Sequence, residues 1–149
     1  MKRCFLMGHD DAPDGLLSAL SAEIERHIID YGVTEFLVGK YGSFDSLAAK
    51  ALADAKKRHR SVTLTLLLPY HPGERSVKLP DGFDGSLYPP NMEKVPRRLA
   101  IVRANHYAVD TSGYMIAYAW KAGSNTLKIV EFAQSQERHG QIRVSVLPR

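Results

Sequence analysis

The sequence predicts an α/β fold with a doubly wound, mainly parallel sheet of five strands, in a single domain over residues 1–149. Short apolar segments alternate with segments of helical periodicity from one end of the chain to the other, which is typical of repeated βα units. Right-handed crossovers between such units place helices on both faces of a parallel sheet. The segment 62–68 is nearly all apolar, as expected of a strand that is buried on both faces.

The first half of the chain holds three of the expected strands. We expect a strand over 3–7, followed by a helix whose apolar residues repeat at helical spacing until a glycine ends it. A second strand over 34–38 leads into a helix that opens at Ser43 or Asp45. The apolar strand over 62–68 follows that helix.

The segment 69–95 is different, because prolines and glycines are concentrated in it. It is long for a connection, so we expect it to be a functional flap or a mobile loop. Pro96 then suits the first turn of a new helix. A strand over 113–120, a helix over 125–138 and a last strand over 142–146 complete the expected fold.

The composition is that of an ordinary soluble domain. Of the 149 residues, 44% are hydrophobic and 24% are charged, enough for one core. The net charge of +4 is mild and the basic residues are scattered, which favours a solvated surface over a nucleic-acid patch. The single cysteine, Cys4, excludes an internal disulfide framework. Its apolar strand predicts a buried thiol, and we expect the protein in a reducing cytoplasm.

Two further kinds of function find no support in the sequence. No apolar run approaches the roughly 20 residues of a membrane span. The six histidines show no paired spacing of metal ligands, so we expect no metal site.

Glycines and polar residues come directly after three of the expected strands, where parallel sheets bind their ligands. The first strand ends in Gly8 and His9. A dinucleotide fingerprint needs G-x-G-x-x-G at this point, and only Gly8 fits it. His9 has three interpretations: it contacts a ligand, it acts in acid–base chemistry, or it satisfies local backbone groups.

The second motif runs from Gly39 to Asp45. Gly39 and Gly42 permit a tight turn, and Ser43 can both cap a helix and touch a phosphate. Asp45 either binds a ribose or base, or places favourable charge at a helix N-terminus. A carboxylate introduced at Gly42 is expected to repel a ligand phosphate and leave the domain folded.

The helix that starts near Pro96 and the loop before the last helix supply further candidates. Asn105 falls in an apolar stripe, where an amide must find partners. Arg103 either joins an ion-pair network with Asp110 or reaches a phosphate. The loop before the last helix and the start of that helix contain Gly123, Ser124, Asn125 and Thr126. This segment is either an anion-binding site or an ordinary N-cap.

In their order along the chain, these motifs resemble the YpsA-like branch of the SLOG superfamily, a Rossmann-like group that also holds the DprA and Lonely Guy proteins. Two residues depart from the family pattern. Asp10 stands where a basic residue often follows Gly-His, and Gly113 replaces a common acidic residue. The matching elements are Cys4-Phe5-Leu6-Met7-Gly8-His9, Gly39 through Asp45 with Ala48, Arg103-Ala104-Asn105, Val109-Asp110-Thr111-Ser112, Ile116-Ala117-Tyr118, and Ser124-Asn125-Thr126 with Glu131-Phe132-Ala133.

The resemblance implies a single domain that binds a nucleotide or nucleotide-derived ligand, such as an ADP-ribose or NAD-related species, and acts as a sensor. We expect no cofactor beyond this ligand. The expected partners are the nucleotide and, in a homodimer or larger homo-oligomer, further copies of the chain, but no membrane and no nucleic acid. A DprA-like nucleic-acid module would need a basic face that the scattered charge does not provide.

Whether the chain is an enzyme stays open. The alternative function is hydrolysis of an N-glycosidic or nucleotide bond, as in phosphoribohydrolases, with Glu131 or Asp45 stabilising an oxocarbenium-like centre. The Lonely Guy enzymes carry P-G-G-x-G-T-x-x-E, with the glutamate three residues after the threonine. Here Ile129 stands at that position, and Glu131 lies about 200° further round the helix. We therefore expect little or no release of a base from nucleoside monophosphates.

Overall fold

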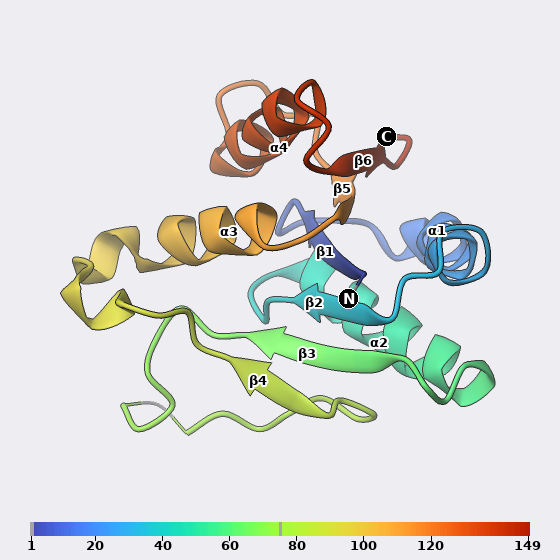
Figure 1. Ribbon diagram of the computed structural model, residues 1–149, viewed down its shortest axis with the longest axis horizontal. Helices are drawn as coiled ribbons and strands as arrows, with labels where there is room; N and C mark the ends of the chain where they lie inside the picture. Colours follow the sequence, from blue (N-terminus) through green and yellow to red (C-terminus); the bar gives the residue numbers. More distant parts are fainter. Residues whose placement is uncertain (1, 75) are drawn as a thin grey trace.

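A computed structural model describes residues 2–74 and 76–149. Over these residues, six strands form one all-parallel sheet with the order β4-β3-β2-β1-β5-β6 (Figure 1). The predicted α/β class is thus confirmed. The central strand β1 pairs with β2 on one side and with β5 on the other. The strands are β1 (Arg3–Gly8), β2 (Glu35–Val38), β3 (Thr63–Leu67), β4 (Gly85–Leu87), β5 (Tyr114–Tyr118) and β6 (Arg143–Val146).

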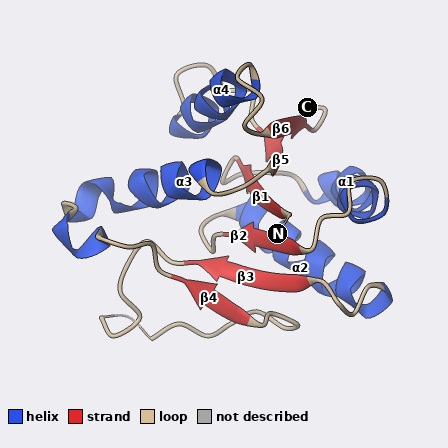
Figure 2. Ribbon diagram, in the orientation of Figure 1, coloured by secondary structure: helices blue, strands red, loops and turns tan. Residues whose placement is uncertain are grey.

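Helices cover both faces of the sheet, as the sequence predicts (Figure 2). One face carries α1 (Leu17–Ile29) and α2 (Ser43–Arg58), and the other carries α3 (Ala100–Asp110) and α4 (Asn125–Glu137). A 3₁₀ turn, Arg97–Leu99, precedes α3. None of the helices in the described part of the chain is both long and apolar enough to cross a membrane.

The alternation of side chains along β1 supplies both cores. Cys4 and Leu6 pack toward α1 and α2, whereas Phe5 packs toward α3 and α4. All three side chains are buried, because each face of the strand is covered by a helical layer. Cys4 is buried, as the sequence predicts, and burial raises the pKa of its thiol.

The prediction of five strands is wrong by one, because β4 lies within the segment that was expected to be a loop. β4 is three residues long and pairs with β3 through Gly85, Ser86 and Leu87. Its side chains carry no apolar pattern, so backbone pairing alone makes it a strand. The Asp84 carboxylate beside it accepts the Leu64 N–H at 2.8 Å and forms an ion pair with Lys56.

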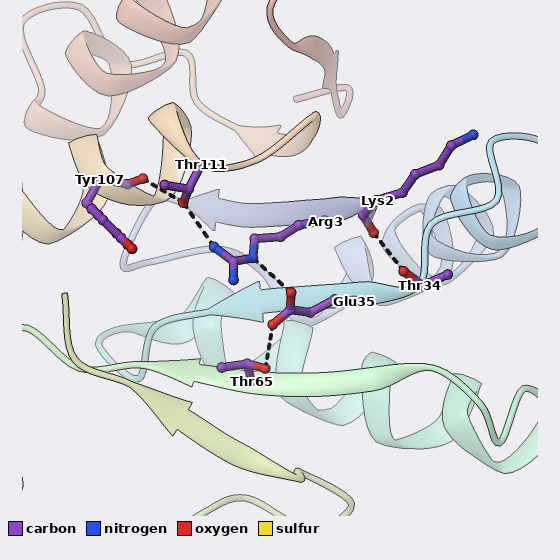
Figure 3. A network of polar contacts seen from close by, with 7 residues as sticks. All are labelled: Lys2, Arg3, Thr34, Glu35, Thr65, Tyr107 and Thr111. Atoms are coloured by element: carbon purple, nitrogen blue, oxygen red, sulfur yellow. Dashed lines mark hydrogen bonds and ion pairs between the residues drawn. The ribbon is translucent and has the colours of Figure 1, made fainter. Parts of the chain in front are cut away.

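A polar network joins three strands and the end of α3 at the amino ends of the strands (Figure 3). Arg3 Nε donates to Glu35 Oε1 at 2.9 Å, and Arg3 Nη1 donates to Thr111 Oγ1 at 2.9 Å. Thr65 Oγ1 donates to the second carboxylate oxygen of Glu35, also at 2.9 Å. Glu35 is 8% exposed, so its charge needs these partners.

We therefore expect Arg3→Met to lower the free energy of unfolding by about 2 kcal/mol, because it leaves the Glu35 carboxylate without its cation. Urea denaturation measures the change. The matched control is Arg103→Met, which removes an exposed arginine that has no ion pair among the described residues. That control should change stability by less than about 0.5 kcal/mol. Equal effects of the two substitutions would show that the network does not stabilise the fold.

Candidate functional site

A cavity of about 450 Å³ lies at the carboxyl ends of β1, β2 and β3, between the β2–α2 turn and the helices α3 and α4. It lies where the strand order reverses, since the chain leaves β1 for β2 on one side and reaches β5 on the other. Ligands of open α/β sheets bind at this kind of switch point. The residues expected from the sequence that line it are Gly8, His9, Gly39, Asp45, Asn105, Ser124, Asn125 and Thr126.

A larger hollow of about 890 Å³ lies elsewhere, between α2 and the turn at 80–82. None of the expected site residues lines it. Its polar residues are mainly the lysines of α2, including Lys50 and Lys57, on a helix surface that faces solvent. The smaller cavity is the better candidate, because it lies at the strand ends and at a helix N-terminus.

His9 holds the two sides of the cavity together. Its Nε2 accepts the backbone N–H of Trp120 at 2.9 Å and that of Lys121 at 3.1 Å. Two donors to one ring nitrogen require that nitrogen to be unprotonated, so the proton of the neutral ring is on Nδ1. Burial and the nearby Lys121 ammonium lower the pKa of His9, which favours the same neutral form. His9 therefore does satisfy backbone groups, but those of the distant loop after β5, and it also lines the cavity.

The β2–α2 turn packs against the backbone of Asp10, two residues after the end of β1. Gly42 has a φ of +95°, and a Cβ there would lie 2.7 Å from the Cα of Asp10. Ser43 N–H donates to the Asp10 carbonyl at 2.8 Å. Gly42 and Ser43 therefore do not line the cavity. Gly8 packs just as closely, since a Cβ there would lie 2.4 Å from the Phe44 ring. A side chain at Gly42 would strain this turn, so we expect any substitution there to destabilise the fold in addition to its effect on a ligand.

Asp45 lines the cavity from the first turn of α2. Its Oδ2 accepts the Tyr41 N–H at 2.9 Å. Burial raises the pKa of Asp45 to about 7, although the hydrogen bond from Tyr41 opposes the shift. The carboxyl group therefore exchanges a proton near neutral pH, unlike an ordinary aspartate that only adds charge to a helix terminus.

The N-terminus of α4 is capped and still offers two donors. Ser124 Oγ accepts the Leu127 N–H at 3.1 Å and donates to the Lys121 carbonyl at 2.8 Å. The expected N-cap is thus confirmed. The backbone N–H groups of Asn125 and Thr126 have no hydrogen-bond partner among the residues that the structure describes, and both residues line the cavity. Gly123 shapes the turn with a φ of +76° and lies outside the cavity.

The helix α3 contributes a residue that the sequence predicted and one that it missed. Asn105 lines the cavity, and its amide has no hydrogen-bond partner within the described chain. Arg103 is exposed, lies outside the cavity and forms no ion pair with Asp110. Arg98, in the 3₁₀ turn, lines the cavity instead. Arg98 lies seven residues before Asn105, and seven steps of 100° come within about 20° of two full turns, so the two residues share one side of a helix. The helical phase of Asn105 could therefore have identified Arg98.

Lys121, which sequence reasoning did not identify, lies three residues after the end of β5, lines the cavity and forms an ion pair with Asp11. Glu131 is exposed and does not line the cavity. Within residues 2–74 and 76–149, no three side chains of His, Cys, Asp or Glu gather closely enough to hold a metal ion.

No protein-family model matches this sequence, and a comparison with curated proteins gives no match either. The resemblance to the SLOG superfamily therefore depends on the motifs of this chain alone. The fold and the cavity provide the independent basis for a function.

The two glycines with positive φ near the cavity give a matched test of the β2–α2 turn. We expect Gly123→Ala to lower the free energy of unfolding by about 1 kcal/mol, because it adds only backbone strain in open space. Gly42→Ala should cost about 3 kcal/mol or more, since its Cβ also meets the Asp10 backbone. Urea denaturation of both variants measures the difference. Similar values for the two would mean that the turn does not press on Asp10.

Proposed function

We propose that the protein binds a nucleotide or nucleotide-derived ligand, of the ADP-ribose or NAD-related class, in the cavity at the carboxyl ends of the strands. The observation that carries this proposal is the convergence of unpartnered donors on one hollow. The N–H groups of Asn125 and Thr126, the Arg98 guanidinium and the Asn105 amide all line it, and none has a hydrogen-bond or ion-pair partner among the described residues.

The donors are suited to a phosphate group. Free N–H groups at a helix N-terminus attract anions, because the helix dipole adds to their hydrogen bonds. Arg98 offers a planar fork of donors that matches phosphate oxygens. Lys121 adds positive charge, although Asp11 neutralises part of it. The phosphate of the ligand is accordingly assigned to the side of the cavity formed by α4 and the 3₁₀ turn.

The remaining walls are suited to a base and a sugar. Apolar side chains line the cavity from β1, β3, α3 and α4, and a flat base can pack against such a surface. The Asn105 amide can both donate to and accept from the edge of a base. Asp10 and Asp45 can accept hydrogen bonds from ribose hydroxyls. The apolar lining consists of Met7, Leu67, Ile101, Val102 and Ile129, with Phe5 and Leu6 behind them.

The volume also favours a ligand of this size, because small-molecule sites have volumes of roughly 300–1,000 Å³. Membership of the YpsA-like branch of the SLOG superfamily is part of the same proposal, and in that case the protein serves as a sensor of its ligand. The motifs quoted for that family contribute His9, Asp45, Asn105 and the start of α4 to this cavity region.

The proposal is tested by titrating ADP-ribose into the parent protein and into Arg98→Gln by calorimetry. We expect the variant to bind about tenfold to a hundredfold more weakly, because a charge-assisted bond to phosphate is lost. Arg103→Gln is the matched control and should change affinity by less than about twofold, since Arg103 lies outside the cavity. No binding by the folded parent at millimolar ADP-ribose would contradict the proposal, and so would an equal loss in both variants.

One observation favours hydrolysis as a second candidate function. Asp45 lines the cavity, and burial raises its pKa to about 7. A general acid or base works best when its pKa is near the working pH. If the protein is a hydrolase, Asp45 rather than Glu131 is therefore the candidate general acid or base.

Incubation with AMP, followed by chromatography of free adenine, separates the two functions. Under the binding function we expect no release of adenine above the rate without protein. Release that disappears in Asp45→Asn, persists in Glu131→Gln and changes steeply with pH around 7 would instead establish hydrolysis through Asp45. Glu131→Gln is the matched control, because it removes an exposed carboxylate outside the cavity.

A further inference from the structure

A second hollow of about 340 Å³ adjoins the cavity on the side of β3 and β4. We call it the outer hollow; it is lined by Tyr70, His71, Tyr88, Met92, Glu93 and Arg97, among others. Pro69, directly beyond the end of β3, lines both the cavity and the outer hollow. A small gap of about 60 Å³ between Tyr41 and Tyr70 also shares Pro69. The two hollows are therefore neighbours along one edge of the sheet.

The walls of the outer hollow are aromatic. The rings of His71 and Tyr88 meet edge to face, with their centroids 5.3 Å apart. The Arg97 guanidinium lies over the Tyr70 ring, 4.8 Å from its centroid. Planar groups stack on tyrosine rings with little dependence on their own substituents. The half-buried Tyr88 ring is therefore the wall on which one further flat ring can stack.

The outer hollow contains a carboxylate that has no cationic partner among the described residues. Arg97 is paired with Glu74 at 3.2 Å, which leaves the exposed Glu93 carboxylate without an ion pair among the described residues. Desolvation raises the pKa of the Tyr88 hydroxyl, and the negative charges of Glu93 and Glu74 raise it further. A cationic ring would gain from this carboxylate and from the electron-rich face of Tyr88.

We infer that the outer hollow binds a cationic pyridinium ring, so that the ligand is a dinucleotide in the oxidised nicotinamide form. This inference rests on the proposed function, because the cavity must hold the phosphate and the first nucleoside. The pyridinium ring then extends past Pro69 and stacks beside Tyr88, with Glu93 opposite its positive charge. The reduced dinucleotide carries an uncharged dihydropyridine ring and lacks this attraction. The protein therefore distinguishes the oxidised from the reduced dinucleotide.

Calorimetric titrations with ADP-ribose, NAD⁺ and NADH test the inference. We expect NAD⁺ to bind at least about threefold more tightly than NADH. Glu93→Gln should remove most of that preference and leave the affinity for ADP-ribose unchanged, since ADP-ribose lacks the nicotinamide ring. Glu131→Gln, an exposed glutamate outside both hollows, is the matched control and should keep the preference. Tyr88→Leu should weaken NAD⁺ binding severalfold, because it removes the ring beside which the pyridinium stacks.

The outcomes separate the inference from the proposed function. If ADP-ribose binds but NAD⁺ and NADH bind equally, the outer hollow does not select a cationic ring and the inference fails alone. It also fails if the preference survives in Glu93→Gln. If neither ADP-ribose nor NAD⁺ binds, the proposed function fails with it. Glu93 is exposed, so its variant is expected to fold even if Tyr88→Leu does not.

Discussion

One ring nitrogen of His9 holds the candidate site in shape. By accepting two backbone N–H groups from the loop after β5, it ties the end of the first strand to the segment that leads into α4. The N-terminus of α4 can then lie over the cavity with its donors free. An acceptor needs a lone pair, so the site requires a neutral ring, and burial provides for that by lowering the pKa of His9.

The glycines around the cavity have a similar explanation. Gly8 lies against the Phe44 ring, and Gly42 lies against the Asp10 backbone, so both permit protein to approach protein rather than ligand. This close packing fixes the turn that carries Asp45, which forms one wall of the cavity. On the opposite wall the charges are separated, with Arg98 toward the cavity and Glu93 toward the outer hollow. A ligand that spans the two would be oriented by its own charge distribution.

Much of the fold could be predicted from the sequence, because apolar periodicity reports burial on a helix or strand. The edge strand β4 could not, since three residues held by backbone pairing leave no pattern in their side chains. The position of the site was predictable from glycines at strand ends. The contacts within the site were not predictable. His9 accepts a hydrogen bond from a residue more than a hundred positions away, and the roles of Gly42 and Ser43 depend on their contacts with Asp10. Arg98 was missed because the scattered basic residues were interpreted as solvated surface, although its helical phase matches that of Asn105.

The pairing of β1 with β5 has a consequence for how the protein is made. β1 is synthesised well before β5, yet one of its edges is covered by the five residues of β5, Tyr114–Tyr118. Contacts between such distant segments form late, because a long stretch of chain must be ordered to close them. A nascent chain that ends before β5 therefore has β2 beside β1 on one edge and nothing beside it on the other. Until β5 is made, the packing of α1 and α2 against β1, β2 and β3 is what holds this part of the sheet together.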